Sequence, residues 1–250
     1  AFSGRPGAPN RNAILHVVIA GLHAYNVATA AGLKEREDMP GIHFYFDPCG
    51  NLDRKEDLLL HSARSLLHEK WFILKTLVSR RGCFLAATYH PKYPVAIYEN
   101  NDFFICLEGT IYGESEAGVD AKLGDLAGIL FGNPPRSLDR ARDWLLATDG
   151  DFVIFIQHRK TGSICVVNDA LGRLPLYYRH EAGRLALSRE SRFITNLDNS
   201  VEFDRLAIAQ YLLLGFMPGD KTFFEGVSRL EPATLISIDP EGCADPQSNE

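Results

Sequence analysis

The feature that most constrains the fold of this chain is the segment from residue 164 to 192, ICVVNDALGRLPLYYRHEAGRLALSRESR. It contains three short apolar runs, at 164–167, 176–178 and 185–187. Asn, Asp, Gly and Pro lie between the runs, and short apolar runs separated by such residues are typical of β-strands joined by turns. The segment therefore predicts a meander of antiparallel strands.

The same signals predict further strands and helices along the chain. Strands are expected at 42–46, 95–98, 103–107 and 152–156, the middle two joined as a hairpin. Helices are expected where apolar residues recur at helical spacing, namely over 53–79 with Asp53 as N-cap, 119–131, 137–147, and from Asp204 to Gly215. Strand and helix blocks that succeed one another in this way are compatible with an α+β protein.

Composition and charge exclude several classes of function. The 250 residues are 46% hydrophobic and 23% charged, which is enough apolar material for a full globular core. The formal net charge of −6 argues against a nucleic-acid partner, because such proteins usually carry a basic face. The five cysteines are widely spaced and the histidines show no metal spacing, so reduced thiols, no metal site and a cytoplasmic location are expected.

The first 38 residues differ in character from the rest of the chain and are interpreted as an N-terminal extension, partly disordered or helical. A start rich in Gly, Pro and Asn leads into an apolar, Ala-rich stretch over 14–33, which predicts a helix. His16, His23 and Asn26 make that stretch a poor membrane span, so no membrane role is expected. The domain itself is expected over 39–240, with 241–250 as a tail or the start of a linker.

Two further motifs accompany the opening segment. Met39-Pro40-Gly41-Ile42 precedes the first strand of the domain, and Glu108-Gly109-Thr110-Ile111-Tyr112 follows the strand at 103–107. In this order the blocks resemble the glutaminase domain of asparagine synthetases, a class II glutamine amidotransferase with the N-terminal-nucleophile (Ntn) hydrolase fold. The resemblance implies a four-layer αββα sandwich of two antiparallel sheets over about residues 39–240.

The resemblance also implies a chemistry that needs a cysteine at the start of the domain. In the family, removal of the Met of Met-Cys-Gly-Ile exposes this cysteine. Its thiolate attacks the glutamine amide with its own α-amino group as base. Pro40 occupies that position here and has no thiol. Two alternatives stay open, namely Cys49, about 23 Å further along an extended chain, or a free N-terminal Pro40 acting as a base.

The second motif resembles the family's Asn-Gly-Glu-Ile-Tyr. There the Asn side chain and the Gly amide donate hydrogen bonds to the oxyanion, and the Glu binds the substrate amino group. Gly109 is retained, but Glu108 replaces the donor and Thr110 replaces the acid. Loss of one such donor typically costs about 3 to 4 kcal/mol of barrier, and an ionised carboxylate would also repel the oxyanion.

Two other parts of the family's site have uncertain counterparts. Asp149 lies where the family places an acidic residue near the substrate amino group, although a residue before a strand can equally bond its own backbone. The family's arginine clamp for the substrate carboxylate has no match, and the nearest segments are SRRGCF at 79–84 and YHPKYP at 89–94. Pro40, Gly41, Glu108, Gly109, Thr110 and Asp149 are therefore predicted as vestigial positions of a glutamine site.

The expected function is that of a degenerate glutaminase domain with a structural or interface role. Its partner would be an ATP-dependent synthetase domain or subunit, and a homodimer is left open. ATP and magnesium are expected only in that partner, because these 250 residues contain no nucleotide-binding motif. Two alternatives remain: an active amidotransferase domain that releases ammonia for asparagine synthesis, and a non-catalytic module that binds a small ligand.

Overall fold

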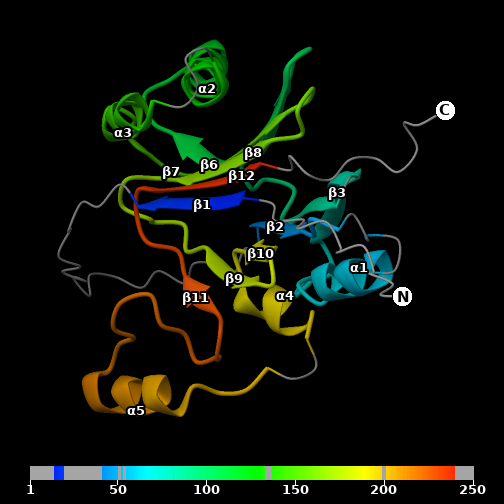
Figure 1. The fold of residues 1–250 in the computed structure, drawn as a ribbon, viewed down its shortest axis with the longest axis vertical. Coiled ribbons are helices and arrows are strands. Elements are labelled where there is room, and N and C mark those ends of the chain that lie inside the picture. Colours follow the sequence, from blue (N-terminus) through cyan, green and yellow to red (C-terminus); the bar gives the residue numbers. More distant parts are fainter. Residues whose placement is uncertain are drawn as a thin grey trace, which may run out of the picture.

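Two antiparallel sheets packed face to face form the centre of the molecule (Figure 1). The computed structural model describes residues 14–19, 41–49, 52, 55–80, 82–132, 137–198 and 201–239, and each sheet has six strands within these residues. Sheet A runs in the order β1 (Ile14–Ile19), β12 (Thr234–Asp239), β8 (Ile164–Asn168), β7 (Gly150–His158), β6 (Phe103–Ile111), β5 (Val95–Glu99). Sheet B runs in the order β11 (Ser228–Arg229), β9 (Tyr177–Glu181), β10 (Arg184–Ser188), β2 (Gly41–Phe46), β4 (Cys83–Tyr89), β3 (Ile73–Arg80).

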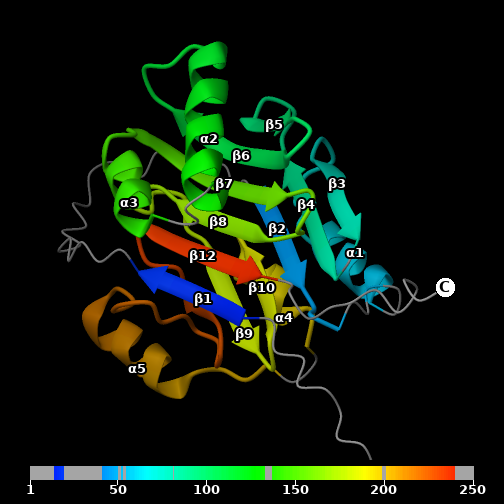
Figure 2. The ribbon, with the colours of Figure 1, turned by 45° about the horizontal axis from the view of Figure 1, so that its top comes forward.

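Helices cover the outer faces of both sheets (Figures 1 and 2). On sheet A lie α2 (Glu116–Phe131) and α3 (Leu138–Leu146), whose buried leucines share a core with the outward side chains of β6 and β7. On sheet B lie α1 (Glu56–Arg64) and α4 (Ser191–Thr195). The predicted α+β fold, a four-layer αββα sandwich, is confirmed.

The alternation of side chains along each strand explains why the central strands are apolar throughout. In β7, Phe155 points into the layer between the sheets, where its ring lies 5.3 Å from that of Phe44 on β2. Its neighbours Ile154 and Ile156 point the other way, toward the helices on sheet A. A strand buried on both faces reads as a continuous apolar run, as 152–156 does.

The long helix predicted over 53–79 is wrong. The structure divides this segment into α1 and the strand β3, which pairs antiparallel with β4. Leu74 and Leu77 are three residues apart, a helical spacing, and the strand register shifts between Thr76 and Val78. A strand there nevertheless satisfies its backbone groups on β4 through a tight turn at Gly82, whose φ is +75°. Asp53, the expected N-cap, lies outside the described residues, and α1 begins after Lys55 with no side-chain cap.

The predicted meander over 164–192 is partly wrong. All three apolar runs form strands, and β9 and β10 pair as an antiparallel hairpin, but β8 belongs to sheet A. The chain crosses from one sheet to the other at 169–175. The carboxylate of Asp169 holds this crossing, because it accepts hydrogen bonds from the amides of Leu171 (2.9 Å) and Arg173 (3.1 Å).

The helix expected over 14–33 is also wrong for its first six residues, which form β1 at the edge of sheet A. Each of them is in register with a residue of β12, from Ile14 opposite Asp239 to Ile19 opposite Thr234. Four of the six are β-branched, which favours a strand, and β12 would otherwise present an unpaired edge. The remainder of 1–38 and the tail at 241–250 lie outside the described residues, so their predictions stay predictions.

The helices predicted over 119–131, 137–147 and 204–215 lie where they were expected, as α2, α3 and α5 (Arg205–Leu214), whereas the short α4 was not predicted. The side chains of Ser137 and Asp204 cap α3 and α5, and Gly215 ends α5 with a φ of +76°. In Figure 1, α5 lies apart from the two sheets, on the side of β11. Among the described residues, none of the helices has the length and apolar character needed to cross a membrane.

Candidate functional site

Glu108 occupies the centre of the predicted site and is bound on several sides. It lies in β6 with its side chain fully buried, beside the first residues of β2. One carboxylate oxygen accepts hydrogen bonds from the Nε of Arg189 (2.8 Å) and the hydroxyl of Tyr93 (2.7 Å), and the other accepts from the amide of Ile42 (2.9 Å). Arg189 is itself almost buried and donates a further bond, at 2.6 Å, to the carbonyl of Pro175.

This ion pair fills the space beside Gly41, the residue directly after the predicted nucleophile position. A Cβ atom placed on Gly41 would overlap the carboxylate of Glu108 and would come within 2.6 Å of the Cγ of Arg189. Gly41 also has a φ of +66°, so glycine is required here on both counts. Pro40 lies outside the described residues.

Gly109, which the family uses as an oxyanion donor, has its amide occupied. Its N–H donates to the carbonyl of Pro94 at 2.8 Å, which ties β6 to the end of the 89–94 segment. The residue has a φ of +98°, and an added Cβ would overlap the carbonyl of Asp151 on β7. Gly109 therefore serves the close contact between β6 and β7, and its N–H points to an oxygen of the protein itself.

Thr110 and Asp149 do not join the buried cluster. Thr110 is exposed and pairs across β6 and β7 with Asp151. Asp149 lies opposite Tyr112, four residues or about 13 Å along β6 from Glu108. Its side chain is 78% exposed and stands 3.8 Å from Arg173, which makes a shorter pair, at 2.8 Å, with Asp151. The structure thus places Asp149 away from Glu108, whereas Thr110 follows Glu108 by two residues on the same strand and is exposed.

None of the four cysteines in the described residues lies beside Gly41 as a reactive thiol. Cys49 is exposed but comes after the opposite end of β2. Cys83 and Cys106 are buried, and burial raises the pKa of both thiols to about 12, which disfavours the nucleophilic thiolate. Cys165 is buried in β8, and Cys243 lies outside the described residues. Among the described residues no His, Cys, Asp and Glu side chains form a group suited to a metal.

His43 is a buried titratable group that the sequence reasoning missed. It lies two residues after Gly41, fully buried, with its ring nitrogens 2.9 Å from the Ser188 hydroxyl and 3.0 Å from the Thr88 hydroxyl. Its ring stacks on Phe193 at 5.2 Å. Burial, and to a smaller extent the positive charge of Arg189, lower its pKa to about 3. His43 is therefore a neutral packing residue at neutral pH.

This pKa predicts a loss of stability in mild acid. Between the unfolded pKa of about 6.5 and the folded value, the unfolded chain binds a proton that the folded chain does not. The free energy of unfolding should therefore fall as the pH falls below 6.5, by about 2 kcal/mol at pH 5 from this group alone. Urea unfolding at pH 7 and pH 5 tests this, with His43→Gln as the comparison. An equal loss in both proteins would contradict it.

The arginine at the site is one that sequence reasoning had not assigned. Of the two candidate segments, 79–84 lies at the end of β4 away from Gly41, where Arg80 pairs with Cys83 and donates to Gln157 at 3.3 Å. Arg189 instead comes directly after β10, and Tyr93 belongs to the 89–94 segment. The available signal was an arginine immediately after a buried strand, but its partner lies 81 residues away in the chain.

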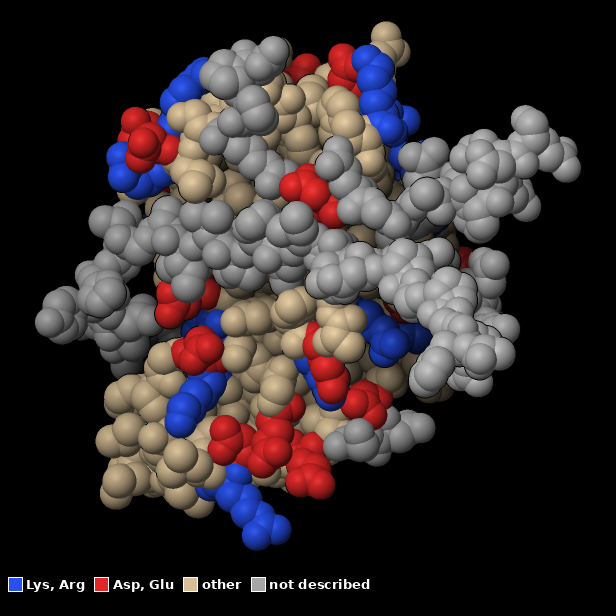
Figure 3. All heavy atoms as spheres, in the orientation of Figure 1, with Lys and Arg blue, Asp and Glu red and all other residues tan. Residues whose placement is uncertain are grey.

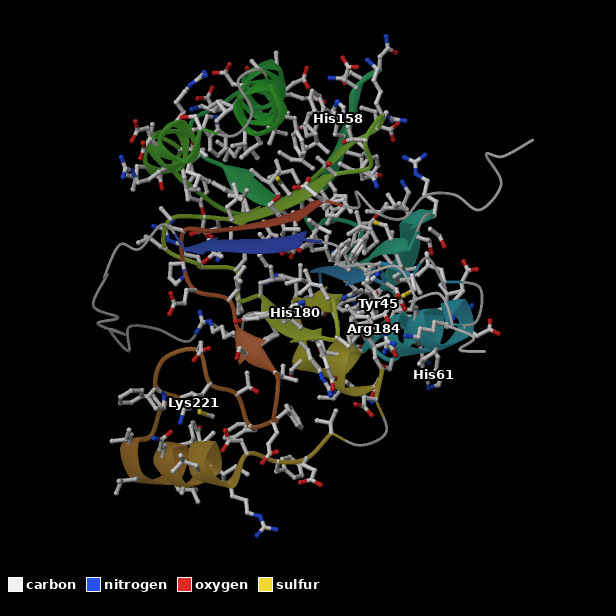
Figure 4. All side chains as sticks on the ribbon, viewed as in Figure 1. Tyr45, His61, His158, His180, Arg184 and Lys221 are labelled. Atoms are coloured by element: carbon white, nitrogen blue, oxygen red, sulfur yellow. The ribbon has the colours of Figure 1, made fainter. Side chains whose placement is uncertain are left out.

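A hollow among these elements lies elsewhere. A space of about 410 Å³ opens on the outer face of sheet B, lined by both cationic and anionic side chains. It includes Tyr45 and Arg184, labelled in Figure 4, and Lys55, whose Nζ donates to the Tyr45 hydroxyl at 2.7 Å. Gly41 and Glu108 do not line this space. The predicted glutamine site and this hollow are therefore separate places.

Comparisons with known proteins agree on one kind of domain. A family described as "Glutamine amidotransferase domain" matches residues 139–248, which include Asp149 but neither Gly41 nor Glu108. The curated asparagine synthetase [glutamine-hydrolyzing] 1 of Bacillus subtilis (strain 168) is 26% identical in an alignment of 159 positions that covers 58% of this chain and 24% of that protein. The chain thus spans about a quarter of the length of this relative.

Two solved structures are similar at low sequence identity. The glutamine phosphoribosylpyrophosphate amidotransferase from B. subtilis, complexed with ADP and GMP, is 12% identical with a TM-score of 0.47. A structure described as the allosteric regulatory enzyme of purine biosynthesis is 11% identical with a TM-score of 0.46. Each match covers 81% of this chain and about half of the other, 48% and 47% respectively.

Proposed function

We propose that this chain, which carries a class II glutamine amidotransferase domain related to asparagine synthetase, no longer hydrolyses glutamine. In this proposal the domain keeps its fold as a structural and interface module. It would serve an ATP-dependent, amide-forming synthetase domain or subunit. Amine would then reach that partner directly rather than as ammonia released from glutamine.

The observation that carries the proposal is the ion pair between Glu108 and Arg189. Amide hydrolysis needs preorganised donors aimed at the oxygen on which negative charge develops. Here the N–H groups of the Ile42 amide and of the Arg189 guanidinium donate hydrogen bonds to the carboxylate of Glu108, and the Gly109 N–H donates to the carbonyl of Pro94. The Gly109 amide, the oxyanion donor that the resemblance assigns to a residue retained here, thus donates to an oxygen of the protein itself, and the replaced donor, Glu108, is an acceptor held by its own ion pair.

The second support is the nature of residue 40. A covalent mechanism requires a nucleophile that attacks the glutamine amide carbon, releases ammonia and leaves a glutamyl thioester. Pro40 offers no thiol or hydroxyl for that bond. Cys49 stands at the far end of β2 from Gly41, and the buried thiols of Cys83 and Cys106 have raised pKa values. Two independent requirements of the reaction are therefore unmet.

The role of a partner is inferred from length and chemistry. The relative from B. subtilis is about four times as long as the part this chain spans, and its name includes both glutamine hydrolysis and asparagine synthesis. No nucleotide-binding motif occurs in the 250 residues. We therefore assign ATP and magnesium to the partner, and propose a cytoplasmic location for both.

The proposal is tested by measuring glutamate and ammonia release from glutamine by the purified chain. We expect a rate equal to that of buffer, with a glutamine-hydrolysing asparagine synthetase as positive control. Turnover that disappears in Cys49→Ser or Pro40→Ala would contradict the proposal and identify the nucleophile. We also expect no rise in Tm with glutamine. A rise without hydrolysis would favour a ligand-binding module instead.

A further inference from the structure

Helix α5 is apolar around most of its circumference but is poorly covered. Its sequence is RLAIAQYLLL, and among its ten residues only Ala207 is buried. Successive residues of a helix lie about 100° apart, so Leu206, Leu212, Leu213 and Leu214 together span more than half of the circumference. Helices that are apolar all round normally lie inside a protein. In this structure α5 lies apart from both sheets (Figures 1 and 2).

The exposed apolar side chains of α5 and its flanking segments form what we call the α5 surface. Leu212 and Leu213 are 79% and 84% exposed. The complete set is Phe203, Leu206, Tyr211, Leu212, Leu213, Leu214, Phe216 and Phe223. The ring of Tyr211 packs edge-on against Phe223 at 5.1 Å, which joins the helix to the segment after it. In Figure 3 the region of α5, at lower left, is almost free of charged side chains.

The α5 surface is large enough for a stable protein interface. With about 200 Å² of accessible surface for one such side chain, the exposed fractions correspond to roughly 900 Å². The largest apolar patch on a typical monomer is about 300 to 600 Å². A standard interface buries about 800 Å² on each partner, so covering this surface with an equal one matches what a stable dimer needs.

The charges at the two ends of α5 point to the identity of the partner. Arg205 stands exposed in the first turn, where the helix dipole makes a positive charge unfavourable, and no basic residue lies in the last turn. A negative charge, that of the exposed Asp220, follows the C-terminal end of the helix in the chain. In an antiparallel pair of α5 helices, Arg205 of one chain would lie beside the C-terminal end of the other. Arg205 then supplies the positive charge that the last turn of the partner's helix lacks, while the N-terminal end of each helix is already capped by its own Asp204.

We propose that the α5 surface binds the same surface of a second copy of this chain, with the two α5 helices antiparallel about a two-fold axis. Such an interface is isologous, because each chain contributes the same residues. The partner's helix covers Leu206, Leu212 and Leu213, and its flanking Phe203 and Phe216 cover the sides of the helix. The inference is independent of whether the glutamine site is active.

The test is the mass of the purified chain in solution, measured by light scattering after size exclusion and by sedimentation at several concentrations. We expect twice the mass of one chain at micromolar concentration. Leu213→Glu should raise the dissociation constant at least about 100-fold, because it places a charge in an apolar contact. The matched control is Leu146→Glu, at the end of α3 and 51% exposed, which lies on the opposite side of the molecule. It should leave the dimer unchanged.

A second variant tests the antiparallel arrangement. Arg205→Glu should weaken the dimer about tenfold, more strongly at low salt than at high salt, while Arg205→Lys should not. Circular dichroism of each variant confirms that it is folded. A monomeric native chain would overturn the proposal and leave the α5 surface to another partner, such as the rest of a longer polypeptide. A dimer unaffected by Leu213→Glu, or equally lost in Leu146→Glu, would overturn it as well.

Discussion

Replacing Glu108 with alanine is expected to lower the free energy of unfolding by about 3 to 5 kcal/mol. The side chain is fully buried, and its removal leaves the guanidinium of Arg189 without a counter-ion in a nearly buried place. It also leaves the Ile42 amide and the Tyr93 hydroxyl without their acceptor. Unpaired buried donors add to the loss. For a domain of this size the melting temperature should fall by roughly 10 °C.

Urea and thermal unfolding measure this effect, and a double-mutant cycle assigns it to the pair. Arg189→Met should also destabilise, because it strands the carboxylate of Glu108. The combined Glu108→Ala and Arg189→Met variant should lose less than the sum of its two single changes, because no unpaired charge remains. Glu181→Ala, which removes an exposed partner of Arg179, is the matched control and should change stability by less than about 0.5 kcal/mol. Additive changes at Glu108 and Arg189 would contradict the assignment.

Under the proposed function, the same ion pair is what holds the fold together at a site without glutamine hydrolysis. Glu108 joins β6 to the start of β2 through Ile42, to the 89–94 segment through Tyr93 and to the end of β10 through Arg189. In an active enzyme, hydrogen-bond donors at the reaction site are left for the substrate and are satisfied only when it binds. Once a carboxylate of the chain accepts them permanently, they contribute to stability instead, and we infer that selection for the fold alone would preserve Glu108.

The strands were predictable from sequence where burial is one-sided or complete, because the period of apolar residues then reports the structure directly. The runs at 42–46, 103–107 and 152–156 all became strands at these positions. The segment 73–80 failed because β3 is an exposed edge strand, whose leucines need not show a period of two. Membership of a sheet was not predictable either. The crossing at 169–175 consists of turn residues that would serve equally well within one sheet.

Part of the candidate site was predictable because it lies in one short motif. Glu108 could be read as a replaced family position and Gly109 as a retained one. In the structure, Glu108 lies beside the start of β2 and Gly109 lies against Asp151 of β7. Arg189 could not be identified, because the pairing joins residues 81 positions apart and depends on the packing of the two sheets. Asp149 matched the family in sequence order but lies about 13 Å along β6 from Glu108. Order along the chain predicted the fold better than it predicted which side chains meet.

Replacing Gly109 with alanine should destabilise the protein by about 3 to 5 kcal/mol although no buried polar group is removed. The residue has a φ of +98°, which an L side chain rarely adopts. The new Cβ would overlap the backbone carbonyl of Asp151 and approach the Cδ1 of Leu174 to 2.9 Å. A backbone atom cannot move aside as a side-chain end can, so the strands β6 and β7 must separate. That separation also weakens the bond from the Gly109 amide to Pro94.

The matched control for Gly109→Ala is Gly124→Ala in α2, where an added Cβ meets no atom within 4 Å. Alanine is favoured over glycine inside a helix, so this change should stabilise by about 0.5 to 1 kcal/mol. Opposite signs for the same chemical change, measured by urea unfolding, would show that the β6–β7 contact and not the methyl group is responsible. If Gly109→Ala were neutral, the two strands could separate freely there. The Gly109 amide could then turn from Pro94 toward a substrate, and the argument for a lost oxyanion site would fail with it.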